Sequence, residues 1–238
     1  MGMKTEEKLI LKGKRLDGRK PEDIRKVEMK VGVIPSANGS AQVRFGDTEV
    51  VAGVYGPRAL FPKHLQKRDK AIIQCRYNMA PFSVEDRARP GPSRRSKEIS
   101  KVTRLALEPA LFLEKYPEMV VDVYIEVLQA DGSTRVTGIN AASLALADAG
   151  VPMKDLVVAL SGGKINDTII IDLCGKEDNY SSADVPIAFL PRKKEITLLQ
   201  MDGQLVPEEL KKILKIALKS GQKIYEKQKE VLKKRYEE

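Results

Sequence analysis

Tryptophan is absent from this 238-residue sequence, histidine occurs once and cysteine twice. Both cysteines, Cys75 and Cys174, lie within or beside apolar strand patterns, so we expect reduced, buried thiols of an intracellular protein, with no role in metal binding. No apolar run approaches the length of a membrane span, and the polar N-terminus lacks the apolar core of a signal peptide. The sequence therefore predicts a soluble, cytoplasmic protein with no membrane partner.

The composition favours a nucleic acid as partner. The net charge is +9, and 32% of the residues are charged, mostly Lys and Glu, which would also suit work at high temperature. With 42% hydrophobic residues, the chain is long enough for one sizeable core or two small ones. We expect one elongated domain.

The segment 129–135, Gln-Ala-Asp-Gly-Ser-Thr-Arg, joins a predicted strand to a predicted helix. Upstream, apolar and polar residues alternate over 121–127, as in a half-buried strand. Downstream, 139–149 predicts an amphipathic helix that Gly150 and Pro152 close. A helix that begins after such a loop has unpaired N–H groups at the positive end of its dipole, so the segment predicts an anion site.

The side chains of this segment favour phosphate as the anion. Gly132 permits a tight bend, Ser133 and Thr134 can donate hydrogen bonds, and Arg135 can hold two phosphate oxygens at once. A turn followed by a helix cap, with Arg135 pointing into water, would use the same residue types, and both readings stay open on these residues alone.

The remaining patterns predict an α+β protein of two sheet-plus-helix halves in a single domain, 1–238. Residues 1–14 form a Lys- and Glu-rich N-terminal extension, and 207–235 predicts a C-terminal helix with Pro207 at its first position. Another helix is expected from Ile99 until Pro109 breaks or kinks it. Further strands are predicted at 27–33, 41–45, 48–54, 71–77, 156–160, 168–173, 185–189 and 196–201.

Two basic segments suit contact with a phosphate backbone. Between 58 and 70, five cations and His64 accompany one aspartate, although a solvated loop is the usual explanation of such a charge run. In 86–99, a Pro/Gly loop leads into a helix, and Arg94 and Arg95 lie at the helix end where phosphate binds best.

Two carboxylates, Asp178 and Asp184, lie in a connecting loop and directly before the strand 185–189. Together they could hold Mg²⁺, which takes one or two carboxylates plus phosphate oxygens and water. A turn carboxylate and a cap at the start of the strand would explain them equally well. Their occurrence together with a phosphate loop and an arginine pair in one basic protein favours a functional site over separate structural roles.

These motifs together resemble the RNase PH family along nearly the whole chain, most closely the catalytic RNase PH-like subunits of the archaeal exosome. The motifs that carry the resemblance are Arg-Leu-Asp-Gly-Arg at 15–19, Met-Ala-Pro-Phe-Ser at 79–83, Pro-Ser-Arg-Arg at 92–95, the segment 129–135, Ala-Ala-Ser-Leu-Ala-Leu-Ala-Asp-Ala-Gly-Val-Pro at 141–152 and Ala-Asp-Val-Pro at 183–186.

The resemblance implies the RNase PH-like fold, which is similar to domain 2 of ribosomal protein S5. It also implies a phosphate-dependent 3′→5′ exoribonuclease that releases nucleoside diphosphates and that can run in reverse to add RNA tails. Ser133 stands where the family more commonly has glycine, which bears on how closely the loop backbone approaches the anion.

The resemblance also implies roles for the anion loop, the arginine pair and the two aspartates. Phosphate is the co-substrate, held by Ser133, Thr134 and Arg135; Asp178 and Asp184 are catalytic, and both are ligands of a Mg²⁺ cofactor. In the family an arginine pair contacts RNA near its 3′ end, and it falls on Arg94 and Arg95. Beyond the resemblance, we also expect RNA contacts from Lys63, His64 and Arg68 in the basic segment 58–70, and from Tyr77. No motif reads base edges, so degradation should be largely independent of RNA sequence.

The implied partners are single-stranded RNA, a non-catalytic RNase PH-like paralogue in a hexameric ring built as a trimer of heterodimers, and RNA-binding cap subunits of S1 or KH type. Two alternatives stay open: a non-catalytic RNA-binding ring subunit, and a homohexameric RNase PH that trims tRNA 3′ ends. The first would be expected to lack the Thr-Arg pair or the aspartates, and this chain has both.

Overall fold

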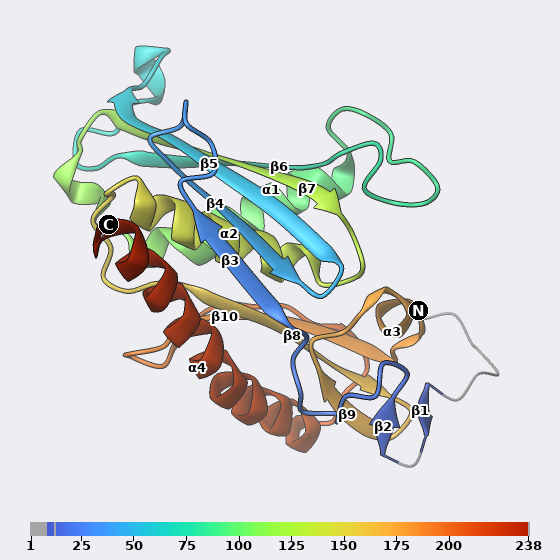
Figure 1. Ribbon diagram of the computed structural model, residues 1–238. Helices are drawn as coiled ribbons and strands as arrows, with labels where there is room; N and C mark the ends of the chain where they lie inside the picture. The colour runs from blue at the N-terminus through green and yellow to red at the C-terminus, as the bar shows by residue number, and fades with distance from the viewer. Residues whose placement is uncertain (1–8, 12, 238) are drawn as a thin grey trace.

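Two helices lie between two five-stranded sheets, and a long third helix covers the outer side of the second sheet (Figure 1). The computed structural model describes residues 9–11 and 13–237. The layers are therefore sheet, helices, sheet and helix, which confirms the predicted α+β fold class with two sheet-plus-helix halves. The buried apolar core runs through both sheets without a break.

The first sheet has the strand order β3-β4-β5-β7-β6. Its strands are β3 (Val27–Val31), β4 (Gly39–Phe45), β5 (Thr48–Ala59), β6 (Ile72–Met79) and β7 (Met119–Gln129). Only the β6–β7 pair is parallel, and α1 (Arg94–Leu107) makes the crossover between these two strands. The predicted kink is confirmed, because α1 passes into a short 3-10 helix, Glu108–Ala110, that contains Pro109.

Helix α2 (Thr134–Asp148) is buried on all sides, because it packs against the first sheet on one side and against β8 and β10 on the other. The prediction of an amphipathic helix is therefore wrong for this segment, whose run of alanines and leucines serves two apolar interfaces at once. The predicted ending is confirmed: Gly150 has a φ of +71°, and its N–H donates to Ala147.

The second sheet has the order β11-β10-β8-β9, and β12 pairs with β10. Its strands are β8 (Val158–Ile165), β9 (Thr168–Ile171), β10 (Ala183–Leu190), β11 (Glu195–Leu199) and β12 (Asp202–Gly203). Between β9 and β10 lies α3 (Gly175–Tyr180), a short helix where the sequence predicted only a connecting loop.

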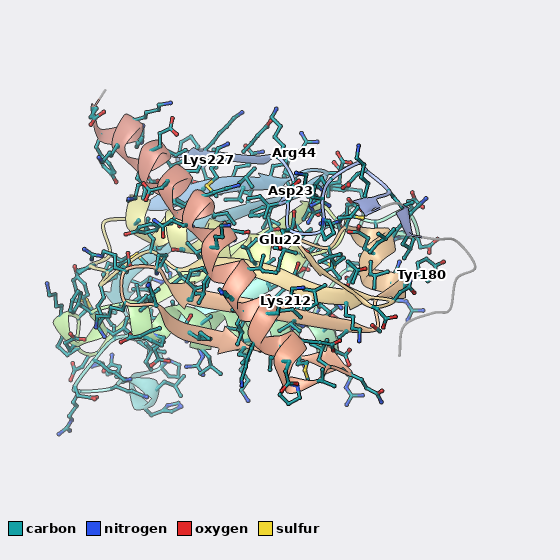
Figure 2. The ribbon with its side chains drawn as sticks, turned by 90° about the horizontal axis from the view of Figure 1, so that it is seen from below. Glu22, Asp23, Arg44, Tyr180, Lys212 and Lys227 are labelled. Atoms are coloured by element: carbon teal, nitrogen blue, oxygen red, sulfur yellow. The ribbon has the colours of Figure 1, made fainter. Side chains whose placement is uncertain are left out.

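Helix α4 (Pro207–Glu237) confirms the predicted C-terminal helix and packs mainly on β8, β9 and β3. A Cβ on Gly221 would lie 2.4 Å from the Phe189 ring, so glycine allows the helix to approach the sheet closely. Figure 2 shows α4 crossing the face seen from below, with Lys212 and Lys227 upon it. Lys212 is exposed, as expected for the solvated outer side of this helix.

The predicted N-terminal extension lies partly outside the described residues. Its described part includes β1 (Ile10–Leu11) and β2 (Lys14–Arg15), which pair as a small hairpin. Leu9 is buried beside the second sheet, against Ile165 and Leu173. Two more 3-10 helices occupy Lys63–Leu65 and Leu113–Lys115. Within the described part of the chain, no helix is long and apolar enough to cross a membrane.

Candidate active site

A cavity of about 570 Å³ opens where the two halves of the chain meet. The N-terminal ends of α1 and α2, helix α3, the start of β10 and the segment between β11 and β12 surround it. Its charged and amide-bearing lining residues are Arg95, Glu98, Arg135, Asp178, Asn179, Asp184, Gln200 and Asp202. Ser133 and Thr134 complete the set, so most of the predicted site residues lie around one cavity.

The anion loop, residues 130–133, connects β7 to α2 as predicted, but α2 already begins at Thr134. Gly132 has a φ of +71° and packs so tightly that a Cβ would lie 2.6 Å from the Cys174 carbonyl carbon. Ser133 also has a positive φ, +54°, in the left-handed region that favours glycine. The loop therefore turns sharply and places the N-terminus of a fifteen-residue helix at the cavity.

The Ser133 side chain is already engaged within the protein. Its hydroxyl donates to the Leu173 carbonyl at 2.7 Å and lies 2.6 Å from the Ser161 hydroxyl. Backbone N–H groups, rather than the Ser133 hydroxyl, are therefore the donors that the loop has free to offer an anion. A phosphate contact from the Ser133 side chain stays a prediction.

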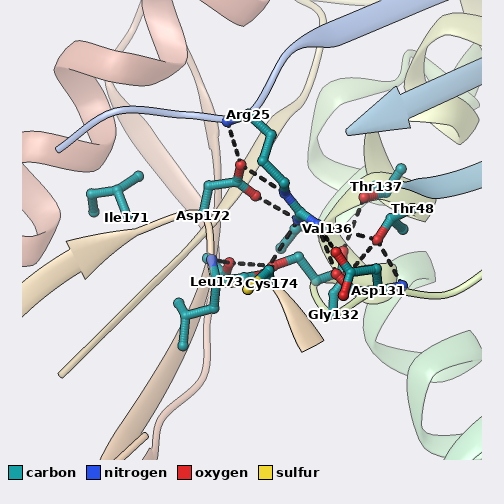
Figure 3. Close-up of polar contacts among 12 residues, drawn as sticks. Arg25, Thr48, Asp131, Gly132, Val136, Thr137, Ile171, Asp172, Leu173 and Cys174 are labelled. Carbon is teal, nitrogen blue, oxygen red and sulfur yellow. Dashed lines mark hydrogen bonds and ion pairs between the residues drawn. The ribbon is translucent and has the colours of Figure 1, made fainter. Parts of the chain in front are cut away.

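Arg25 fastens the anion loop to the second half of the chain (Figure 3). Its guanidinium donates to both Asp172 carboxylate oxygens, at 3.0 and 2.7 Å, and to the Asp131 carbonyl at 2.7 Å. Thr48 adds a hydrogen bond to the Gly132 carbonyl at 2.8 Å and accepts one from the Asp131 N–H at 3.0 Å. Arg25, Asp172 and Thr48 are buried, so the loop is supported by a charge pair that water does not reach.

The Arg135 guanidinium lies in the cavity between two partners that the sequence prediction missed. It donates to Glu98 on α1 at 2.9 Å and to the Gln200 side-chain oxygen, and Gln200 in turn donates to Glu98 at 3.0 Å. Arg135 is therefore held at the cavity wall by two side chains and does not point freely into water.

Asp178 and Asp184 reach the cavity from α3 and β10. Burial and the neighbouring Asp178 carboxylate raise the pKa of Asp184 to about 7, and burial also raises the pKa of Asp178. Arg135 and Arg95 oppose both increases. The two carboxylates therefore repel each other in a partly dry site, an arrangement that favours a shared proton or a bound cation.

Asp178 lies on helix α3, which a buried charge pair holds in place; the prediction that it lies in a connecting loop is therefore wrong. Glu177, next to Asp178, is fully buried and pairs with Arg15, whose guanidinium also donates to the carbonyls of Ile171 and Asp172. Hydrogen bonds to Arg15 keep the pKa of Glu177 low against the opposing effect of burial. Arg15 of the Arg-Leu-Asp-Gly-Arg motif thus stabilises helix α3 and the position of Asp178 upon it.

The arginine pair divides between two positions at the start of α1. Arg95 lines the cavity, whereas Arg94 is exposed and is absent from its lining. The Ser93 hydroxyl caps the helix by accepting from the Ser96 N–H at 3.0 Å. This cap fixes the first turn of α1, from which Arg95 reaches the cavity.

Tyr77 does not lie where an RNA contact needs it. Its side chain is 3% exposed, and its hydroxyl donates to the Thr134 hydroxyl oxygen at 2.9 Å. The prediction of a direct RNA contact at Tyr77 is therefore wrong; the ring packs behind Thr134 and orients its hydroxyl. The period-two pattern of 71–77 already placed Tyr77 on the same face as Ile73.

Lys63, His64 and Arg68 are exposed and lie outside the cavity lining. They belong to the loop after β5, which Figure 1 shows at the opposite end of the molecule from α3. Two cations counted in this loop are paired instead: Arg58, on β5, with the buried Asp122 at 2.6 Å, and Lys70 with Glu108 at 3.0 Å. The structure therefore does not bring this loop to the candidate active site.

Both cysteines are free thiols and are partly buried. Burial raises the pKa of Cys75 to about 12 and that of Cys174 to about 11, so neither forms a thiolate readily.

The family models of the 3′ exoribonuclease family match most of the chain: domain 1 of the family matches residues 23–152, and domain 2 matches residues 155–220. The exosome complex component Rrp41 of Pyrococcus furiosus is 60% identical over 224 residues, which cover 94% of this chain and 90% of that protein. Rrp41 of Nitrosopumilus maritimus is 50% identical, with coverage of 94% and 92%.

Solved structures have the same fold. Rice Rrp46 superposes with a TM-score of 0.84 at 26% identity and covers 92% of this chain and 100% of that chain. An Archaeoglobus fulgidus exosome with RNA bound to the active site has a TM-score of 0.79 at 25% identity, with coverage of 90% and 92%.

Proposed function

The chain belongs to the 3′ exoribonuclease family, and on that premise we propose that it is the catalytic subunit of an archaeal exosome. It is a phosphate-dependent 3′→5′ exoribonuclease that releases nucleoside diphosphates and, in reverse, extends RNA 3′ ends. The observation that carries this function is one cavity that joins a helix N-terminus, two arginines and two carboxylates whose pKa values are raised.

The reaction is a displacement at phosphorus. An oxygen of inorganic phosphate attacks the last phosphodiester, and the bond from that phosphorus to the 3′ oxygen of the penultimate nucleotide breaks. The terminal nucleotide leaves as a diphosphate, and the released 3′ oxygen takes a proton. Positioning and charge stabilisation supply most of the rate in such reactions.

The phosphate nucleophile is held by Thr134, Arg135 and the N–H groups of the anion loop. The closed ring of hydrogen bonds around Arg135 and the Tyr77 bond to Thr134 support this assignment, because they orient both side chains at the α2 N-terminus. Ser133 contributes through its backbone and through the turn that it makes.

Asp184 and Asp178 are the carboxylates that would hold Mg²⁺. The described residues contain no group of three or more His, Cys, Asp or Glu side chains arranged as metal ligands. A pair of carboxylates is nevertheless the protein share that Mg²⁺ requires, since substrate phosphates and water complete its shell. When bound, the ion would stabilise charge on the reacting phosphate. Asp178 either shares this role or protonates the leaving 3′ oxygen.

Arg95 holds the RNA backbone close to the reacting phosphodiester, and Arg94 holds it further out. The position of Arg95 on the cavity wall and the exposure of Arg94 support this order. Arginine contacts to phosphate carry no base information, so the enzyme degrades RNA largely without regard to sequence.

The subunit works in a hexameric ring with an RNase PH-like paralogue, capped by S1- or KH-type RNA-binding subunits, in the cytoplasm. The similarity to named exosome components supports this assembly. A non-catalytic ring subunit is disfavoured, because the Thr134–Arg135 pair and both aspartates line one cavity in this chain.

The test is whether RNA loss requires phosphate. Purified protein incubated with oligoadenylate and Mg²⁺ should release adenosine diphosphate only when phosphate is present; monophosphate release without phosphate would indicate hydrolysis instead. Arg135→Ala should abolish the reaction while the melting temperature changes little, because its ion pair with Glu98, whose side chain is 42% exposed, adds little to stability. Equal losses of stability and activity would mark Arg135 as structural.

A further inference from the structure

Arg135 is the centre of a three-residue ring of hydrogen bonds in the cavity wall. Glu98 comes from α1, Arg135 from the first turn of α2, and Gln200 from the segment after β11. Each member of the ring contacts the other two, since Gln200 donates to Glu98 at 3.0 Å. The Gln200 N–H also donates to the Pro186 carbonyl at 3.1 Å, which ties the ring to the second sheet.

From this ring we propose that Glu98 and Gln200 are positioning residues, which hold the Arg135 guanidinium in one orientation for the phosphate nucleophile. The inference rests on the proposed role of Arg135 as a phosphate ligand. Neither residue needs to touch phosphate itself; both act through the orientation of Arg135.

The N–H groups of the Arg135 guanidinium that the ring does not use remain for an anion. A guanidinium has five N–H donors, and in the described part of the chain Glu98 and Gln200 accept from its two terminal nitrogens. Its Nε lies out of water and has no hydrogen-bond partner among the described residues. Each terminal nitrogen carries a second N–H, so the ring leaves two donors of this cavity-lining guanidinium for an anion, whereas Nε lies too deep to be reached.

A carboxylate beside an anion site would ordinarily repel the ligand, which makes the position of Glu98 informative. Its charge is matched by Arg135, whose side chain is only 20% exposed, and by the amide of Gln200. An unrestrained arginine would sample many rotamers, and each binding event would have to restrict them. The hydrogen bond to Glu98 restricts the rotamers of Arg135 before phosphate binds, although it places one negative charge near the phosphate site.

The experiment compares phosphorolysis of oligoadenylate over a range of phosphate concentrations. The four proteins are the unmodified chain, Glu98→Ala, Glu98→Gln and Gln200→Ala, each assembled with its ring partner where activity needs it. A hydrogen bond to a charged group controls binding by about tenfold or more, so Glu98→Ala should raise the KM for phosphate about tenfold and leave the KM for RNA unchanged. Glu98→Gln keeps an acceptor for Arg135 and should recover most of the loss.

Glu108→Gln is the matched control. Glu108 follows directly after α1 and also accepts from an arginine, Arg104 at 3.1 Å, but it lies outside the cavity lining. Its replacement should leave both KM values unchanged. A general weakening of α1 would instead affect Glu108→Gln and Glu98→Ala alike, together with their melting temperatures.

Opposite results would overturn the proposal. If Glu98 competed with phosphate for Arg135, Glu98→Ala and Glu98→Gln would both lower the KM for phosphate. A decrease confined to kcat, or an equal increase in the KM for phosphate and the KM for RNA, would also exclude a positioning role. Arg135→Lys separates this failure from failure of the proposed function: an unchanged KM for phosphate in that variant would reject Arg135 as the phosphate ligand. If Arg135→Lys raises the KM for phosphate but Glu98→Ala does not, Arg135 remains the phosphate ligand and only the positioning role of Glu98 is rejected.

Discussion

Replacing Asp184 by Asn should stabilise the protein while it removes activity. Asp184 is half-buried at the start of β10, and burial together with Asp178 raises its pKa from 3.8 to about 7. A carboxyl whose pKa is raised on folding favours the folded state as long as it can stay protonated. That contribution is complete below pH 3.8 and is lost as the pH rises through about 7.

The size of the effect follows from the two pKa values. Because one pKa unit corresponds to about 1.4 kcal/mol, ionised Asp184 costs the folded state up to about 4 kcal/mol at pH 8. At pH 5 the cost is about 2 kcal/mol, since the unfolded chain is already ionised whereas the folded one is not. Asparagine carries no charge at either pH. Asp184→Asn should therefore raise the free energy of unfolding at both, and about 2 kcal/mol more at pH 8.

The assay is urea unfolding of the purified chain at pH 5 and pH 8, with a chelator present and phosphate absent, so that no ligand masks the repulsion. Asp202→Asn is the matched control, because Asp202 pairs with Asp184 across the sheet but is exposed. Asp202→Asn should raise the free energy of unfolding much less than Asp184→Asn does. If Asp184→Asn is no more stable than the unmodified chain at pH 8, or if its gain does not depend on pH, burial does not disfavour the Asp184 charge and the argument fails.

Three further outcomes are expected. Asp178→Asn should abolish phosphorolysis and leave RNA affinity in a filter-binding assay largely unchanged, because loss of a carboxylate does not weaken attachment to a polyanion; near-normal turnover would exclude Asp178 from the chemistry. Joint replacement of Lys63 and Arg68 by Ala should weaken binding of long RNA and flatten its salt dependence by about 0.7 log units per lost phosphate contact. Substrates of a few nucleotides should be little affected, because these exposed cations lie outside the cavity lining and only a long strand would reach them; equal effects on long and short RNA would show that the loop does not contact RNA. Gly132→Ala should lower the melting temperature and raise the KM for phosphate together, because its Cβ would lie 2.6 Å from the Cys174 backbone; unchanged values would mean that the loop can shift freely.

Local patterns in the sequence were enough to predict most of the secondary structure. Alternation predicted the strands of both sheets except β12, because side chains in a strand point to opposite faces in turn; β8 continues to Ile165, beyond the predicted end at residue 160. Pro207 and Gly150 marked the beginning of α4 and the end of α2, since proline suits the first turn of a helix and glycine the residue after its end. These signals lie within a few residues of the element that they predict.

The composition of the candidate site could also be predicted from the sequence, but its support could not. Residue types made the anion loop, Arg95 and the two aspartates candidates, the resemblance to the RNase PH family assigned their roles, and the fold brings them to one cavity. Glu98 and Gln200, 102 residues apart, carry no signal that links either to Arg135. Arg25 and Asp172, 147 residues apart, likewise meet only in the folded chain.

Burial on both sides of an element was the other property that only the tertiary structure decided. Helix α2 lies between two sheets, whereas its sequence pattern predicted an amphipathic helix. Tyr77 lies behind Thr134, although it was expected to contact RNA. The short helix α3 forms around Glu177, whose carboxylate is neutralised by Arg15 from the other end of the chain. Sequence by itself determined most strands, the three longer helices and the anion loop, because those preferences are local. The packing of distant segments decided which polar groups lose water and which find partners. Loss of water raises the pKa of Asp184, and the hydrogen bond to Glu98 orients Arg135.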